Sequence, residues 1–233
     1  MTAIFKREFM AYFRTPLGFV LISVMYLFTG YYFFTYNLYM NTTDTAGLFA
    51  MLFSVVLFIV PVLTMRLLSE DRRMKTDHTL LTAPVTRFCI GMGKYLAALC
   101  VYVLAISGTF LTALVLEYFS QPDWPVVFGN FFGLLLLGAA LIAICLFISS
   151  LTENQVVAAV GGFAASLFLI MLDAMQHVVT SSALKTFFRH ISWNGRYRGF
   201  TIGVVGFLDL VFFISIAAFF VCLTVLVLER RRW

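Results

Sequence analysis

The sequence predicts an all-α polytopic membrane protein with six transmembrane helices. Hydrophobic residues make up 62% of its 233 residues and charged residues only 12%, against roughly 25% charged in an ordinary soluble domain. The mean hydropathy is +0.97. A soluble chain of this size cannot bury so much apolar surface, and a span needs about 20 apolar residues. We therefore expect a single transmembrane domain over residues 1–233, with no sizeable water-soluble domain.

The first element, residues 2–15, is too polar to span a membrane. Read as a helix, it places Phe5, Phe9 and Phe13 on one face, with basic side chains on the others. This pattern is typical of an interfacial helix lying on the bilayer surface. A frayed basic flank is the alternative.

Six apolar runs follow. Proline at the first helical position, after Thr15, opens the first span, and Thr152 to Gln155 form a T-x-x-Q capping box that opens the fifth. The expected spans are residues 17–36, 48–68, 95–119, 126–151, 156–172 and 201–228.

The distribution of Lys and Arg predicts that both termini are cytoplasmic. With the N-terminus inside, twelve basic residues face the cytoplasm and four face outward, in agreement with the positive-inside rule. Because the basic residues flank apolar runs, they are topology signals and do not indicate nucleic-acid binding. The inward set is Lys6, Arg7, Arg14, Arg66, Arg72, Arg73, Lys75, Arg87, Lys94 and Arg230 to Arg232, and the outward set is Lys185, Arg189, Arg196 and Arg198.

No arrangement of residues predicts catalysis, a metal site or a bound cofactor. The chain has no HExxH motif and no Walker A motif, so any nucleotide hydrolysis belongs to a partner. Its four cysteines share no hydrophilic loop and show no metal-ligand spacing. Asp209 is a candidate intramembrane polar residue. It can pair with Arg196 or Arg198, or it can face a polar cavity.

The stretch 69–94 is the longest polar segment. Its first half can form a helix with charge pairs between Asp71 and Lys75 and between Glu70 and Arg73. Leu80 and Leu81 then add an apolar face, and Pro84 ends the helix. A short helix with charged and apolar faces is what a docking element for a soluble partner requires. A solvated loop that only sets topology is the alternative.

Residues 173–200, between spans 5 and 6, carry all four outward basic residues. We expect two short re-entrant helices, broken near residues 180–182, that form an outer gate, with Asn194 and Gly195 turning the chain back toward span 6. A flexible amphipathic loop on the surface is the alternative. The candidate gate residues are Asp173, His177, Lys185, Phe187, Phe188, Arg189 and Trp193.

Three motifs resemble the permeases of ABC-2 type transporters. The most specific runs from Met65 and includes Arg66-Leu67, Glu70, Arg72, Thr76, Leu80-Leu81 and Pro84. The run FISSLTENQ at 147–155 resembles the junction of the fourth and fifth spans. The C-terminal run Leu228 to Trp233 resembles the end of the gliding-motility and nitrous-oxide-reductase-maturation branch, although many members of that branch are longer between spans 5 and 6.

The resemblance implies a transmembrane subunit of an ATP-binding-cassette transporter in a bacterial cell membrane. It implies a second permease subunit, cytoplasmic ATPase subunits that bind ATP, and an extracytoplasmic or membrane accessory protein. The 2–15 segment would be an interface helix and the 69–94 stretch a coupling helix. The implied ATPase-coupling residues are Glu70, Asp71, Arg72, Arg73, Lys75, Thr76, Leu80, Leu81, Pro84, Thr152, Glu153 and Asn154.

Two other classes of function stay open from the residues alone. A secondary transporter or channel predicts buried charge along several spans and no docking loop. A membrane scaffold of an envelope complex predicts no dependence on nucleotide.

Overall fold

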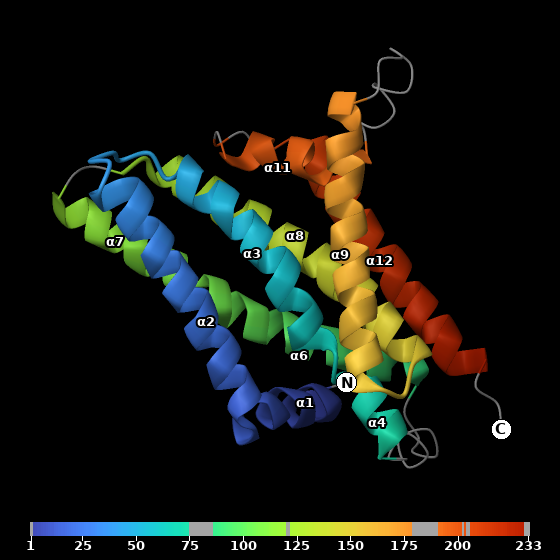
Figure 1. Ribbon diagram of the computed structural model, residues 1–233. Helices are drawn as coiled ribbons and strands as arrows, with labels where there is room; N and C mark the ends of the chain where they lie inside the picture. Colours follow the sequence, from blue (N-terminus) through green and yellow to red (C-terminus); the bar gives the residue numbers. More distant parts are fainter. Residues whose placement is uncertain are drawn as a thin grey trace.

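The computed structural model describes residues 2–74, 86–119, 122–178, 191–201, 203 and 206–230, with the backbone alone at 176–178. Within these ranges the chain forms helices joined by short connections and contains no β-strand (Figure 1). The expected all-α class is therefore confirmed.

In the part of the chain that the structure describes, six helical segments are long and apolar enough to cross a membrane, as the sequence predicts. The chain is thus a multi-pass membrane protein. The six segments are Pro16–Leu38, Ala46–Arg73, Arg87–Phe119, Trp124–Leu151, Gln155–Met175 and Phe207–Arg230.

Helix α8 (Trp124–Leu151) forms the centre of the bundle. It packs against α3 (Ala46–Thr64), α9 (Gln155–Val178) and α12 (Phe207–Arg230). In the most apolar stretch of each helix, 67% of α8 is buried inside the structure but only 17% of α9. Because lipid tails are as apolar as the side chains, close packing supplies much of the association between such helices. The outlying helices therefore present most of their surface to the bilayer or to another protein.

One close approach shows how the centre is packed. A Cβ atom at Gly138 in α8 would lie 2.2 Å from the ring of Tyr102, which comes from α6 (Arg87–Ile106). The Tyr102 hydroxyl donates a hydrogen bond to the Leu134 carbonyl oxygen over 2.7 Å. The glycine leaves the space that the tyrosine ring fills.

The second span is interrupted near one end. Helix α3 ends at Thr64, four turn residues follow, and α4 (Ser69–Arg73) continues the chain. The backbone N–H groups of Leu68 and Ser69 donate to Ser149 Oγ of α8 over 3.3 and 3.2 Å. Ser149 is fully buried, so it satisfies backbone groups that would otherwise lack partners.

The third span begins earlier than expected. Helix α6 starts at Arg87, not near residue 95, so Lys94 lies inside a helix and not in the preceding loop. The helix stops at Ile106, and α7 (Gly108–Phe119) resumes after Ser107.

The chain between spans 5 and 6 differs from the expectation in one respect. Asn194 and Gly195 lie inside helix α11 (Trp193–Thr201), so the predicted turn there is wrong. A turn residue lies instead beyond the end of α11, at Gly203, whose φ of +76° favours glycine. Helix α12 accordingly begins at Phe207, later than the expected residue 201.

The two ends of the bundle carry different short helices. Helix α1 (Thr2–Arg14) and α4 lie at one end, called here the α1 end, and α11 lies across the other, called the α11 end (Figure 1). First-span helix α2 (Pro16–Phe33) joins α1 to a π-helical segment, Phe34–Leu38, at the α11 end.

Candidate functional site

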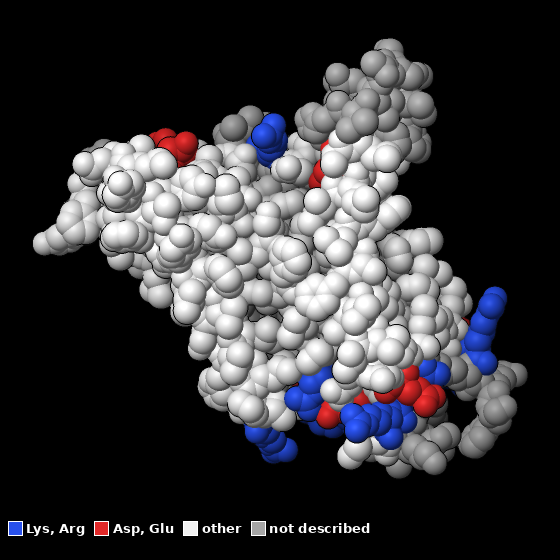
Figure 2. Space-filling model, in the orientation of Figure 1, with Lys and Arg blue, Asp and Glu red and all other residues white. Residues whose placement is uncertain are grey.

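Charged side chains gather at the α1 end. Figure 2 shows Lys, Arg, Asp and Glu together below a broad band that has none on the visible face. The elements that meet there are α1, the turn between α3 and α4, the first half of α6 and the junction of α8 with α9.

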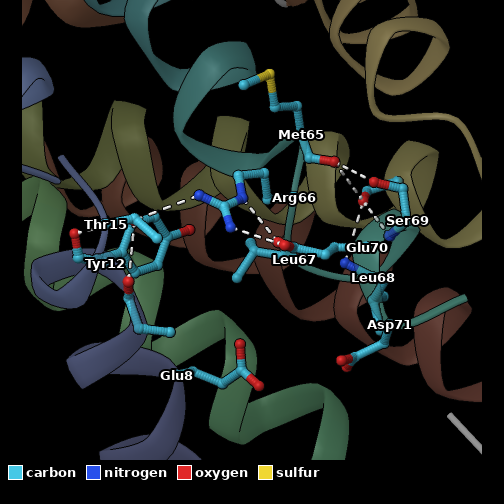
Figure 3. Close-up of polar contacts among 12 residues, drawn as sticks. Glu8, Tyr12, Thr15, Met65, Arg66, Leu67, Leu68, Ser69, Glu70 and Asp71 are labelled. Carbon is cyan, nitrogen blue, oxygen red and sulfur yellow. Dashed lines mark hydrogen bonds and ion pairs between the residues drawn. The ribbon is translucent and has the colours of Figure 1, made fainter. Parts of the chain in front are cut away.

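Glu70 on α4 is held by an arginine from the preceding turn. Both Glu70 carboxylate oxygens accept from Arg66, over 2.7 Å each, and Arg66 also donates to Thr15 Oγ1 over 3.3 Å (Figure 3). The expected pair of Glu70 with Arg73 is therefore wrong, and Arg73 is exposed. The two-pronged contact fixes the orientation of the Glu70 carboxylate relative to the end of α3.

Lys94 is the most deeply buried charge at this end. Its side chain is 1% exposed, and its Nζ atom contacts Glu8 Oε1 at 3.1 Å and Asp71 Oδ2 at 2.6 Å. Nζ also donates to the Leu67 carbonyl oxygen. Three oxygen atoms, from α1, α4 and the turn before α4, thus surround the ammonium group.

Arg7 joins these contacts, and the four residues Arg7, Glu8, Asp71 and Lys94 are called here the charge ring. Arg7 contacts Glu8 directly and Asp71 Oδ2 at 3.6 Å. Each cation therefore contacts both carboxylates, and the net charge of the ring is zero. This balance offsets part of the cost of burying the Lys94 side chain, since a buried charge is tolerated when it is paired and hydrogen-bonded.

Arg72 links α4 to the junction between α8 and α9. It donates to the Ser150 carbonyl oxygen over 3.3 Å and lies 3.9 Å from a carboxylate oxygen of Glu153. The Glu153 side chain is 71% exposed, so its attraction to Arg72 is weak. Arg72 and Glu153, which the third and fourth spans separate in the sequence, thus lie on one surface.

The capping box expected at Thr152 is not formed. Thr152 ends α8, and Asn154 caps α9 because its Oδ1 accepts from the Val156 N–H over 2.9 Å. The Thr152 hydroxyl accepts from the Asn154 N–H over 3.2 Å and so shapes the turn between the helices.

Tyr12 fastens α1 to the end of α3. Its hydroxyl donates to the Leu63 carbonyl oxygen over 2.7 Å, and its side chain is buried. Burial raises the pKa of the Tyr12 hydroxyl above its ordinary value, so this group stays a neutral donor. A small pocket beside it is lined by Glu8, Ala11, Tyr12, Thr15, Arg66, Leu67 and Glu70.

Several predicted coupling residues lie outside the described residues. These are Lys75, Thr76, Leu80, Leu81 and Pro84. Their part of the predicted docking element stays a prediction.

At the α11 end, Asp173 joins α9 to α11. The Asn194 N–H donates to Asp173 Oδ2 over 3.1 Å, so an acidic side chain of one helix lies at the N-terminus of another, where negative charge is favoured. Trp193 is buried against Phe213 of α12, with ring centroids 5.5 Å apart. Of the other predicted gate residues, Lys185, Phe187, Phe188 and Arg189 lie outside the described residues, and the side chain of His177 is not described.

Asp209 forms an ion pair with one of its two candidate partners. Arg196 contacts Asp209 Oδ1 at 2.8 Å, and its guanidinium carbon lies 4.2 Å from the centre of the Phe212 ring. Arg198, the other candidate partner, is exposed.

Sequence reasoning missed the residues that organise the α1 end. The charge count takes Lys94 as a topology signal, and no sequence pattern predicts the contacts that Glu8, Tyr12 and Ser149 make. One signal for Lys94 is in the sequence, because it follows Gly91 and Gly93 inside an otherwise apolar helix. A Cβ at Gly93 would lie 3.0 Å from Ile4 of α1, so small residues beside a lysine mark a close helix contact.

Among the described residues, no group of three or more His, Cys, Asp or Glu side chains is arranged to hold a metal ion. The charged contacts at the α1 end position α4 against α1, α6 and the junction of α8 with α9.

Comparison with known proteins gives one family. A family model described as ABC-2 family transporter protein matches residues 7–226. A search of curated proteins finds no significant match.

Proposed function

Because this chain belongs to the ABC-2 family of transporter proteins, we propose that it is the permease subunit of an ATP-binding-cassette transporter. Two permease subunits form the pathway, and two cytoplasmic ATPase subunits bind and hydrolyse ATP beneath them. The permease itself binds no ATP and carries no cofactor. Its task is to convert movement of the ATPases into movement of the spans.

The observation that carries this proposal is the construction of α4. Four of the five residues of α4 are charged. Ion pairs tie Asp71 to α6 and Arg72 to the junction of α8 with α9, and Glu70 pairs with Arg66 in the turn before α4. A loop that only set topology would not need this fixation. A helix that receives force from a soluble partner must be attached to the spans that move.

The docking surface would comprise α4, the polar segment after it and the exposed junction of α8 with α9. Arg73 and Glu153 are exposed and available to a partner. Leu80 and Leu81 would add an apolar contact, and Lys75, Thr76 and Pro84 would shape the segment that presents it. Thr152 and Asn154 set the turn that places Glu153 beside Arg72.

The orientation follows from the charges. Six spans place both termini on the same side, and the basic residues concentrate at the end that carries α1 and α4 (Figure 2). By the positive-inside rule this end faces the cytoplasm. The α11 end then faces outward, in a bacterial cell membrane.

At the outer end, α11 is suited to close the pathway. Its Trp193, Tyr197 and Phe200 are buried, and its polar contacts reach α9 through Asp173 and α12 through Asp209. A helix fixed to two spans moves when those spans separate. The preceding residues, including His177, Lys185, Phe187, Phe188 and Arg189, would form the rest of this gate.

The basic C-terminal run supports placement in the gliding-motility and nitrous-oxide-reductase-maturation branch. That placement adds an accessory protein, outside or within the membrane, to the proposed assembly.

Purification from native membranes tests the function. A tagged permease is isolated in mild detergent, and the eluate is assayed for ATP hydrolysis that vanadate inhibits. We expect an ATPase subunit, identified by mass spectrometry, to co-purify and to hydrolyse ATP faster with the permease than alone. Reconstituted permease that moves solutes or ions without nucleotide would instead indicate a secondary transporter or channel. An envelope complex without any ATPase would indicate a scaffold.

A further inference from the structure

Lys94 lies where the helix proposed to receive force meets the helix that precedes the first span. Its Nζ contacts Asp71 of α4, Glu8 of α1 and the Leu67 carbonyl oxygen of the turn between α3 and α4. The lysine itself belongs to α6. One side chain thus joins four segments of the chain.

We propose that Lys94 is a positioning residue that makes α1 follow α4, so that movement of α4 reaches the first span as well as the second and third. The proposal rests on the proposed function, because it takes the ATPase as the source of the movement. It adds a route for that movement which runs through the charge ring.

The exposure of the four charged side chains indicates which of their contacts transmit the movement between α4 and α1. The Arg7 side chain is 49% exposed and lies 3.6 Å from Asp71, so water and salt screen this direct contact between α1 and α4. Lys94 is 1% exposed and Glu8 is 12% exposed. Interactions between buried charges are screened far less, so the path from Asp71 through Lys94 to Glu8 is the stronger one.

The corner between α1 and α2 is rigid enough to pass the movement on. A Cβ at Gly18 of α2 would lie 2.6 Å from the Tyr12 carbonyl oxygen, so the two helices touch at their backbones. Thr15, between them, donates to the Ala11 carbonyl oxygen over 3.0 Å and accepts from Arg66. A displacement of α1 therefore turns α2 at its start.

The first test breaks the α1 side of the path. Glu8→Ala removes the carboxylate but leaves Lys94 paired with Asp71, and Lys6→Ala removes an exposed charge from the same helix as the matched control. Each variant is reconstituted in lipid nanodiscs with the ATPase subunit. We expect Glu8→Ala to lower the stimulation of ATP hydrolysis about tenfold, within the usual range of coupling between sites, and Lys6→Ala to leave it unchanged.

A distance measurement separates positioning from a general loss of structure. Spin labels replace Met10 of α1 and Met74 after α4, which are 41% and 68% exposed. In the otherwise unchanged protein we expect one narrow distance distribution with and without ATP, because the two helices move together. In Glu8→Ala we expect a distribution that broadens or shifts when ATP binds.

A disulfide between α1 and α6 should restore the coupling that Glu8→Ala removes. A Cβ built on Gly93 lies 3.3 Å from the Ile4 Cβ, close to the roughly 3.8 Å typical of disulfides. Ile4→Cys with Gly93→Cys, in a background without the four native cysteines, therefore ties α1 to α6 beside Lys94. Added to Glu8→Ala, this pair should restore stimulation when oxidised and lose it again under reductant.

The outcomes distinguish the two proposals. If the unchanged permease neither binds nor stimulates an ATPase, the proposed function fails. If it stimulates the ATPase but Glu8→Ala does so equally well, or if the oxidised disulfide restores nothing, the role of Lys94 is overturned while the proposed function stands.

Discussion

Arg196 contacts Asp209 at 2.8 Å and so joins α11 to the first turn of α12. Both side chains are partly exposed, at 19% and 24%. The guanidinium group also lies over the Phe212 ring. An acidic residue near the start of an apolar span thus has a partner of opposite charge on the preceding helix.

Removal of this pair should weaken the α11 end by a modest amount. Because the charges are partly exposed, we expect Asp209→Ala to cost about 1 kcal/mol of unfolding free energy. Arg196→Ala should cost somewhat more, because the contact with Phe212 is lost as well. Titration with denaturing detergent measures both, and the double variant should lose less than the sum of the single ones. Strictly additive losses would show that the pair does not couple the two helices.

Gly138→Ala should destabilise the centre of the bundle. The new methyl group would overlap the Tyr102 ring, and overpacking of this kind costs about 1–3 kcal/mol. Gly30→Ala is the matched control, since a Cβ at Gly30 meets nothing within 4 Å. Thermal unfolding in detergent should show a lower midpoint for the first variant and no decrease for the second. Equal midpoints would contradict the close contact.

Ser149→Ala should destabilise the backbone conformation at the interruption between α3 and α4. Two buried N–H groups, of Leu68 and Ser69, would lose their acceptor, at about 1–3 kcal/mol for each group left unsatisfied. Ser215→Ala provides the comparison, because that exposed hydroxyl bonds only within its own helix. Hydrogen exchange at Leu68 and Ser69 is the direct measurement. It should accelerate in the first variant, and protection that stays unchanged there would argue against this role.

Cysteine labelling tests the orientation. In a background without native cysteines, a cysteine at Thr43 should react with a membrane-impermeant maleimide added to whole cells, and one at Met74 should react only after the cells are opened. Both positions are exposed, so access depends on the side of the membrane alone. The reverse pattern would overturn the orientation and the proposed docking of an ATPase with it.

Leu80→Asp combined with Leu81→Asp tests the apolar part of the proposed docking surface. A fully covered leucine contributes about 1.5–3 kcal/mol, so loss of both should lower the affinity for the ATPase and abolish stimulation of hydrolysis. Binding of the purified ATPase to permease in nanodiscs gives the affinity. Arg73→Ala, in the same region, should have a smaller effect. An unaltered affinity in the double leucine variant would support the alternative of a loop that only sets topology.

Composition was sufficient to predict the six spans, because a run of about 20 apolar residues has few other stable environments. The contacts between spans were not predictable in the same way. Glu70 has basic residues at several helical spacings, and its choice of Arg66 over Arg73 depends on where α3 stops. That stop depends in turn on Ser149, which is about eighty residues away in the sequence.

The partners of Lys94 were also not predictable from the local sequence. A lysine near the start of a span is most often a solvated topology signal, and residues 78–116 include no Asp or Glu that would suggest a partner. Its carboxylate partners come from α1 and α4, and their approach depends on the packing of Ile4 against Gly93. The turn expected at Asn194 and Gly195 failed for a related reason: Asp173, on another helix, accepts from the N–H at the start of α11.

The unequal lengths of the spans have a consequence for the surrounding lipid. The third span comprises 33 residues and the first 23, which at 1.5 Å per residue correspond to about 50 and 35 Å. The hydrocarbon layer of a typical bilayer is about 30 Å thick, so the first span needs only a small tilt while the third must lie oblique or bend, as its interruption at Ser107 permits. A thicker bilayer then favours a steeper third span and a thinner one a flatter span. Since Lys94 belongs to that span, membrane thickness becomes a variable that acts on the orientation of α1 and α4.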